Sequence, residues 1–309
     1  MPLRMNRLQP QAPGAAGPRL VGWAATVLLG FCLAGCRYEL LDPAGPVAAG
    51  EKLILLDALT VMLAIIVPVI IATLAFAWWY RAANPRARRL PDWSYSGRIE
   101  LVVWSIPVLV VVFLGGMAWV SSHELDPGEP LESQGKPLNV QVVSLDWKWL
   151  FIYPDQGVAS VNRLVIPAGA PVRFQLTSGS VMTAFFIPRL GSMIYTMNGM
   201  VSPLNLMADK PGDYFGEAAH YSGDGFSDMN FTASALSASD FAAWVAGVRG
   251  RGPLLDAKSY EVLARQSARA PSFTYGQVQP GLFQAIATQR LPPGPGPAGG
   301  PPARPNPGG

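Results

Sequence analysis

Two long apolar runs without a charged residue dominate the first third of the chain. Residues 58–79 form the first run and residues 101–120 the second, and each contains one proline, Pro68 and Pro107. Each run is long enough to cross about 30 Å of hydrocarbon as a helix, and membrane helices tolerate a proline when neighbours satisfy the freed carbonyl. The pattern predicts two transmembrane helices, which we place at residues 53–80 and 99–121.

After the second run the chain changes to short apolar runs separated by Gly, Pro, Asp and Ser. These runs begin at Asn139, Trp149, Asn162, Pro171, Met193, Leu204, Asp213 and Met229. Strands at this spacing, with turn residues between them, are typical of a β-sandwich or Greek-key barrel. We therefore predict an α+β membrane protein, in which a transmembrane hairpin precedes a Greek-key β-sandwich at residues 122–235 and C-terminal helices follow.

The pattern becomes helical beyond the predicted sandwich. Ser239 and Asp240 predict the start of a helix that runs to Val248, and Asp256 predicts another that runs to about residue 268. The run SFTYGQVQPGLF, from residue 272, predicts an extended segment and then a turn. We assign residues 236–290 to a C-terminal helical arm. Residues 291–309, dominated by Pro and Gly, are predicted to be a disordered tail.

The N-terminus has the pattern of a targeting segment. Arg4, Arg7 and Arg19 precede a short apolar run at residues 20–33, which leads into the tetrapeptide LAGC ending at Cys36. This tetrapeptide resembles the bacterial lipobox, in which the cysteine carries lipid and becomes the first mature residue. We predict a signal peptide at residues 1–35, palmitate attachment at Cys36 and a periplasmic segment at residues 36–52. A signal anchor with a chance cysteine is the alternative.

Charge predicts the orientation and narrows the classes of partner. Five arginines lie at residues 81–98 and only Asp92 and Glu100 oppose them, so the positive-inside rule places this connection in the cytoplasm and the sandwich outside. Charged residues make up 14% of the chain, against about 25% in soluble domains, as expected for a membrane protein. The net charge of +3 is too small to indicate a nucleic-acid partner.

The cysteine and histidine inventory restricts metal chemistry outside the membrane. Of the two cysteines, Cys32 would leave with the signal peptide and Cys36 would carry lipid. The two histidines are His123 and His220. Blue-copper sites need a thiolate, and soft-metal sites normally need several nitrogen or sulfur donors. We expect no metal in this chain; a weak adventitious site formed by His220 and Met229 is the alternative.

Three stretches resemble subunit II of the haem–copper terminal oxidases. They are RIELVVWSIP at residues 98–107, DWKWLFIY at residues 146–153 and SVMTAFFIPRLGSMIYTMNGM at residues 180–200. The resemblance runs from about residue 50 to residue 289. Within this family the chain is similar in particular to the cytochrome bo-type quinol oxidase branch, because it contains the stretches FFIPRLGS and, later, YSGDGFS. The resemblance implies a cupredoxin-like sandwich.

In the cytochrome c oxidase branch of this family, that sandwich holds a di-copper centre. Matched position by position, its ligands fall on Thr183, Ala218, His220, Ser222, Phe226 and Met229. A methyl group, an alcohol and a phenyl ring here replace two thiolates and an imidazole, and none of the three is a useful soft donor for copper. The resemblance therefore implies vestigial ligand positions that bind no copper.

Without copper this chain would not accept electrons from cytochrome c, so the resemblance implies a subunit of a proton-pumping ubiquinol oxidase. Ubiquinol would reduce subunit I directly, haems and copper would reside there, and this chain would carry no redox cofactor. The implied partners are subunits I, III and IV and the lipids of the bacterial inner membrane. Menaquinol in place of ubiquinol stays open, because the quinol site would lie mainly in another chain.

Three residues carry further roles that the resemblance implies. Glu100 corresponds to the residue where protons enter the K channel; a surface carboxylate paired with Arg98 or Arg89 is the alternative. Trp147 matches a tryptophan implicated in passing electrons from the copper centre. Because nothing is left to relay here, we interpret Trp147 and Trp149 as aromatic residues at the interface with subunit I.

Two rival functions are kept beside this interpretation. One is a copper-binding cytochrome c oxidase subunit, which metal analysis would identify. The other is a membrane-tethered lipoprotein for binding or assembly, which would be purified without a haem-bearing partner.

Overall fold

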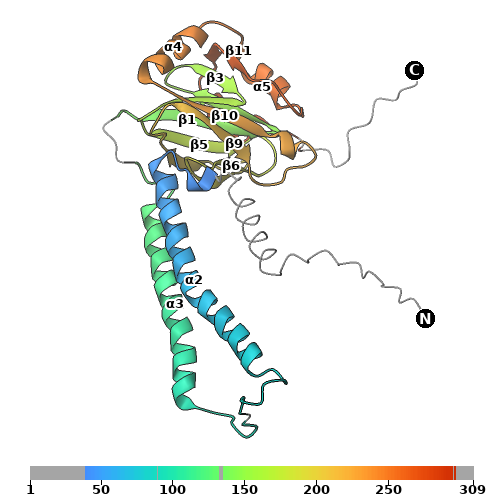
Figure 1. Ribbon diagram of the computed structural model, residues 1–309. Coiled ribbons are helices and arrows are strands. Elements are labelled where there is room, and N and C mark those ends of the chain that lie inside the picture. The colour runs from blue at the N-terminus through green and yellow to red at the C-terminus, as the bar shows by residue number, and fades with distance from the viewer. Residues whose placement is uncertain (1–38, 89, 132–134, 295, 297–309) are drawn as a thin grey trace, which may run out of the picture. The chain divides into compact units, whose positions relative to one another are not determined.

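The computed structural model of the chain describes residues 39–88, 90–131, 135–294 and 296. The predicted signal peptide, the lipid site at Cys36 and most of the predicted tail lie outside these residues. The part of the chain that is described contains a helical hairpin, a β-sandwich and a C-terminal arm, which we define as residues 236–294 (Figure 1).

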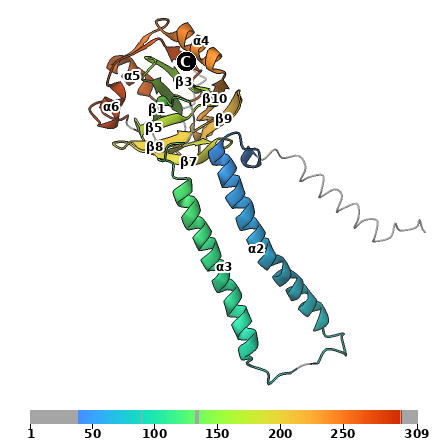
Figure 2. The ribbon, with the colours of Figure 1, turned by 90° about the vertical axis from the view of Figure 1, so that its left-hand side faces the viewer.

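Both predicted transmembrane helices are present, and both are longer than predicted. Helix α2 spans Pro46–Trp79 and helix α3 spans Gly97–Glu124, and together they form a hairpin (Figure 2). Each is long and apolar enough to cross a membrane. Their apolar side chains are mostly exposed, as expected where lipid or other subunits would cover them.

The start of α2 lies upstream of the predicted boundary, so residues 46–52, which we assigned to the periplasmic segment, belong to this helix. A proline at the first helical position explains the start at Pro46, because its missing N–H needs no partner there. The chain just before the helix is fastened to the sandwich: Arg189 forms a salt bridge with Asp42 at 2.7 Å, and Ala44 N donates to the carbonyl of Arg189 at 2.7 Å. The amide of Asn205 likewise donates to the carbonyls of Pro127 and Gly128, each at 3.1 Å, just after α3.

The sandwich consists of two facing sheets and confirms the predicted Greek-key class. One sheet has the strand order β12-β3-β2-β1-β5-β8 and the other β4-β10-β9-β6-β7. Strand β1 pairs in parallel with β5, and β4 with β10, while the other pairs within these two sheets are antiparallel. The strands are β1 (Leu138–Leu145), β2 (Lys148–Tyr153), β3 (Val158–Val161), β4 (Arg163–Pro167), β5 (Val172–Ser178), β6 (Thr183–Ile187), β7 (Gly191–Thr196), β8 (Ser202–Leu206), β9 (Gly212–Ala218), β10 (Asn230–Leu236) and β12 (Phe273–Tyr275). Strands β3 and β6 were not among the predicted runs.

The C-terminal arm differs from its prediction in three places. Helix α4 (Ala238–Val248) begins after Ser237, whose hydroxyl accepts from Asp240 N at 3.1 Å, so Ser239 is not its cap. Helix α5 (Ala257–Ala264) begins at the predicted cap Asp256 but ends before residue 268. The expected turn after residue 278 is followed by a third helix, α6 (Leu282–Ala287), and strands β11 (Leu254–Leu255) and β13 (Gln277–Val278) form a small parallel pair.

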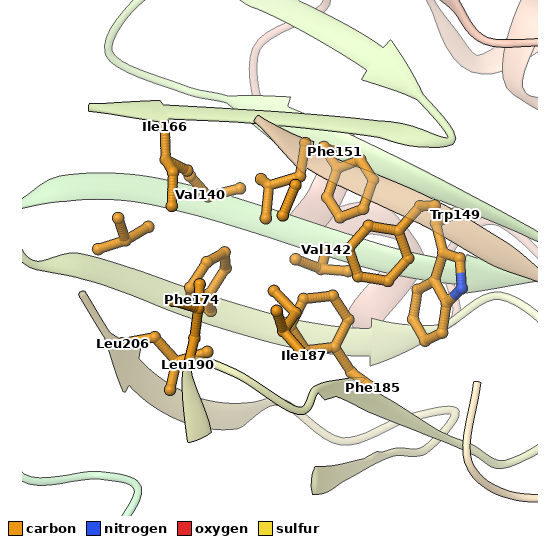
Figure 3. Close-up of a cluster of buried hydrophobic side chains, with 14 of the residues drawn as sticks. Val140, Val142, Trp149, Phe151, Ile166, Phe174, Phe185, Ile187, Leu190 and Leu206 are labelled. Atoms are coloured by element: carbon orange, nitrogen blue, oxygen red, sulfur yellow. The ribbon is translucent and has the colours of Figure 1, made fainter. Parts of the chain in front are cut away.

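Strand β2 is buried on both faces, which explains its continuous apolar sequence. Trp149, Phe151 and Tyr153 point into the core between the two sheets, where aromatic rings pack together (Figure 3). Leu150 and Ile152 point the other way into a second core. The arm covers that outer face with Leu255, Tyr260, Leu263, Leu282, Phe283 and Ile286.

Phe185 lies at the centre of the inter-sheet core, and its removal should destabilise the sandwich. Its ring stacks on Phe231 at 5.2 Å and meets the edge of Trp149 at 5.3 Å between centroids. We expect Phe185→Ala to lower the free energy of unfolding by about 3–5 kcal/mol, because a cavity replaces these contacts. Thermal unfolding followed by near-ultraviolet circular dichroism measures the loss.

Phe215→Ala is the matched control, because this ring is 45% exposed. It should cost less than about 1 kcal/mol. Equal losses for the two variants would contradict the placement of Phe185 in the core.

Candidate functional site

The six vestigial ligand positions lie on and beside the loop that joins β9 to β10. Ala218 ends β9 and Met229 precedes β10, and Ala218 N donates to the carbonyl of Met229 at 3.0 Å across the base of the loop. Thr183 begins β6, and its hydroxyl donates to the carbonyl of His220 at 3.2 Å. We call residues 219–228 the ligand-position loop; it contains the short 3₁₀ helix Phe226–Asp228.

The side chains at these positions do not fit copper. Met229 is buried in the inter-sheet core with Ala218, and Thr183 is buried as well. The ring of His220 packs against Tyr195 at 5.8 Å, and its Nδ1 lies 3.2 Å from the carbonyl of Tyr221. No group of three or more His, Cys, Asp or Glu side chains that could hold a metal occurs in the described part of the chain. A copper site of this family needs thiolates, and this donor set has none.

Trp147 closes the loop from the side of β2. It occupies the turn between β1 and β2 with a φ of 62°, an unusual conformation for a bulky residue. Its indole N–H donates to the carbonyl of Ser222 at 3.0 Å. The ring also lies against Gly225, where an added Cβ would come within 2.2 Å of it, so only glycine fits there.

The structure corrects the interface prediction for Trp149. None of its surface is exposed, because the chain's own core encloses it, and an interface role does not fit this position. Trp147 is only 7% exposed, and the ligand-position loop provides much of its cover. Contact of Trp147 with another subunit stays a prediction.

The residues on either side of Trp147 are a buried carboxyl group and a buried amine, which the sequence analysis missed. Asp146 accepts a hydrogen bond from Ser180 at 2.5 Å through one carboxylate oxygen. Lys148 is 1% exposed and donates to the carbonyl of Arg265 at 2.6 Å, where that residue caps the C-terminus of α5. Carbonyls at a helix C-terminus carry partial negative charge and attract an ammonium. Burial lowers the pKa of Lys148 to about 8, against the opposing effect of the Asp146 charge.

The arm also contacts the ligand-position loop directly. Arg269 forms a salt bridge with Asp228 at 3.1 Å. The side chain of Asn162 links strand β2 to the same part of the arm, since its oxygen accepts from Trp149 N and its nitrogen donates to the carbonyl of Ala270, both at 2.8 Å. The loop is therefore held by protein contacts from the β1–β2 turn and from the arm.

Glu100 lies in the first turn of α3, where its side chain is exposed. Its backbone N–H donates to the carbonyl of Ser96 at 3.0 Å. Within the described residues Glu100 makes no salt bridge, so the predicted alternative of pairing with Arg98 is not seen, and Arg89 lies outside these residues.

Comparison with known proteins identifies the family. A family model described as cytochrome c oxidase subunit II, periplasmic domain, matches residues 156–236, and one described as the COX aromatic rich motif matches residues 249–294. The chain is 47% identical to ubiquinol oxidase subunit 2 of Acetobacter aceti, over 88% of this chain and 87% of that protein. The chain belongs to the ubiquinol oxidase subunit 2 family.

Two further quinol oxidase subunits are also similar to this chain over most of its length. Cytochrome bo(3) ubiquinol oxidase subunit 2 of Pseudomonas putida is 48% identical over 87% of this chain and 85% of that protein. Quinol oxidase subunit 2 of Bacillus cereus (strain ATCC 10987 / NRS 248) is 36% identical over 75% of this chain and 81% of that protein. The predicted family is confirmed, and the aromatic-rich motif coincides with the part of the arm that covers β2.

Loss of the indole N–H at position 147 should loosen the ligand-position loop. Trp147→Phe leaves the buried carbonyl of Ser222 without its donor and should cost about 1–3 kcal/mol. Hydrogen exchange of the loop amides should therefore become faster. Ser222→Ala is the control, because it keeps the backbone acceptor; unchanged exchange in Trp147→Phe would exclude this bond as a constraint.

Burial of Lys148 predicts a pH dependence of stability. Because its pKa falls from 10.5 to about 8 on folding, the folded chain releases this proton at lower pH than the unfolded chain does. The cost of burial is therefore complete below pH 8 and decreases as the pH rises towards 10.5. Relative to Lys148→Met, the native chain should gain up to about 1.4 kcal/mol per pH unit within that window.

Unfolding midpoints of the two chains, compared across this pH range, measure the gain. The matched control is Lys258→Met, which removes an exposed lysine of α5 and should show no such trend relative to the native chain. A constant difference between the native chain and Lys148→Met would contradict the lowered pKa.

Proposed function

We propose that the chain is the copper-free subunit II of a proton-pumping ubiquinol oxidase, and that it supports the complex without carrying electrons. The observation that carries this proposal is the ligand-position loop. Ala218, Ser222 and Phe226 supply no soft donor where the resemblance puts two thiolates and an imidazole, while Trp147 and the arm hold the loop in place. The relatives named as ubiquinol oxidase subunit 2 support the same electron donor.

In this proposal the redox chemistry resides in other subunits. Ubiquinol reduces the haem-bearing subunit I, which contains the haems and copper and reduces oxygen to water. Helices α2 and α3 pack against subunit I, subunits III and IV complete the complex, and the sandwich covers its periplasmic face. A lipid on Cys36 fastens the N-terminus to the bacterial inner membrane. The exposed apolar surfaces of both helices support such an assembly.

The rival functions are less well supported. A copper-binding cytochrome c oxidase subunit does not fit a donor set without a thiolate. A tethered lipoprotein without an oxidase partner does not fit the match to quinol oxidase subunits over most of the chain.

Purification of the intact complex tests the electron donor. We expect ubiquinol to drive oxygen consumption, reduced cytochrome c to drive none, and the isolated subunit II to contain no stoichiometric copper. Stoichiometric copper in this chain, with a near-infrared absorption band, would overturn the proposal.

Glu100 is proposed to take up protons for subunit I from the cytoplasm. Its place in the first turn of α3, exposed and without a salt bridge in the described residues, leaves the carboxylate available. Glu100→Gln should slow turnover and proton uptake about tenfold or more, because proton transfer through a positioned group contributes on this scale. Glu124→Gln, at the opposite end of the same helix, is the control and should leave both rates unchanged. Equal rates in Glu100→Gln and the native complex would exclude the role.

A further inference from the structure

A loop connects α2 to α3 at the end of the hairpin (Figure 2), and its sequence is rich in arginine and aromatic residues. We call residues 80–96 the α2–α3 loop. It contains Arg81, Arg86, Arg88 and Arg89, with Arg98 just beyond it, and Asp92 is its single acidic residue. Exposed aromatic side chains lie in it and at its edge: Trp78, Trp79, Tyr80, Trp93 and Tyr95.

Within the described residues the chain does not neutralise Arg81, Arg86 or Arg88 itself. Across residues 39–88, 90–131, 135–294 and 296, salt bridges join only Arg189 to Asp42 and Arg269 to Asp228. The side chains of Arg86 and Arg88 are both exposed and have no carboxylate partner among those residues. The loop therefore presents a concentrated positive charge that needs an external anion.

Local structure keeps this charge close to the membrane. Arg81 donates to the carbonyl of Trp78 at 2.8 Å, and its guanidinium lies 4.6 Å from the centre of the Trp78 ring. Asn84 donates to the carbonyl of Trp79 at 2.6 Å, so both side chains cap the end of α2. Asn84 N then donates to Arg81 O at 3.0 Å, and the chain turns at once. Arg81 is consequently held at the end of the helix, and Arg86 and Arg88 follow in the loop.

The chemistry of this surface matches an anionic phospholipid. Tryptophan and tyrosine favour the level of the headgroups, where their apolar rings and polar atoms are both satisfied. Arginine binds phosphate through two parallel N–H groups, and basic residues next to a membrane helix attract anionic lipids. We propose that the α2–α3 loop is a binding surface for the headgroups of anionic phospholipids such as phosphatidylglycerol. This inference depends on the two-helix topology and not on the electron donor of the complex.

Retention of lipid by the purified complex tests the proposal. The complex is equilibrated in detergent with equal amounts of phosphatidylglycerol and phosphatidylcholine, washed, and the retained lipid per haem is measured by mass spectrometry. The native complex should retain phosphatidylglycerol preferentially, and high salt should weaken the preference because it screens surface charge. The triple variant Arg81→Gln/Arg86→Gln/Arg88→Gln should lower the apparent affinity for phosphatidylglycerol about tenfold or more.

A variant with the same loss of charge elsewhere provides the control. Arg173→Gln/Arg251→Gln/Lys258→Gln removes exposed cations from the sandwich and the arm, and its lipid retention should equal that of the native complex. Equal retention of the two lipids by the native complex, or undiminished retention of phosphatidylglycerol by the loop variant, would overturn the proposal.

A second measurement on otherwise native protein covers the case in which the loop variant does not assemble. A photoactivatable cross-linking residue replaces Ala83, which is exposed within the loop. Cross-links to phosphatidylglycerol support the proposal. Cross-links to another protein chain, with none to lipid, would show that a subunit covers the loop and would overturn it.

Discussion

The turn between β1 and β2 is the constraint on which the rest of the sandwich depends. Trp147 adopts a positive φ there, which costs about 1–2 kcal/mol for a residue of this kind. In return its indole N–H bonds the carbonyl of Ser222, while the next side chain, Lys148, reaches the end of α5 on the opposite side of the sheet. One turn therefore fixes both the ligand-position loop and the C-terminal arm.

This arrangement holds the conformation of the loop through contacts within the protein. The turn supplies a hydrogen bond and an aromatic ring, and the arm supplies the Arg269–Asp228 salt bridge. Some cost remains, because the buried hydroxyl of Ser222 and one carboxylate oxygen of Asp146 have no hydrogen-bond partner in the described structure. Packing of the aromatic core offsets such local costs, each about 1–3 kcal/mol. A cupredoxin-like fold thus does not by itself imply copper chemistry.

The sequence predicted the features that depend on local patterns. The spans at residues 58–79 and 101–120, the Greek-key class and the cap at Asp256 follow from apolar periodicity and capping chemistry, and the structure agrees. The prediction failed where tertiary contacts determine the secondary structure. Helix α6 begins after Gly281 because its apolar residues cover the outer face of β2, a surface that the local pattern does not reveal.

The environments of Trp149 and Lys148 could not be predicted from the sequence, because both depend on the folded structure. Trp149 was interpreted together with Trp147 as an interface residue, yet strand alternation turns its side chain into the core. Lys148 carries a visible signal, a charge inside an otherwise apolar run, but its partner Arg265 is far away in the sequence. Only the folded arm brings that carbonyl to the lysine.

The composition of β2 makes the arm a required part of the fold. Leu150 and Ile152 would be exposed to water on the outer face of the sheet if the arm did not cover them, and exposed apolar strands promote aggregation. Burial of Lys148 beside these two residues disfavours the charged form of the amine, and the pKa of Lys148 is lowered for that reason. The hydrogen bond from this amine to the carbonyl of Arg265 forms only when α5 lies in one position. Apolar burial therefore brings the arm onto the sheet, and directional contacts then fix its register: the pairing of β12 with β3, the bond from Asn162 to the carbonyl of Ala270, and the bond from Lys148 to the carbonyl of Arg265.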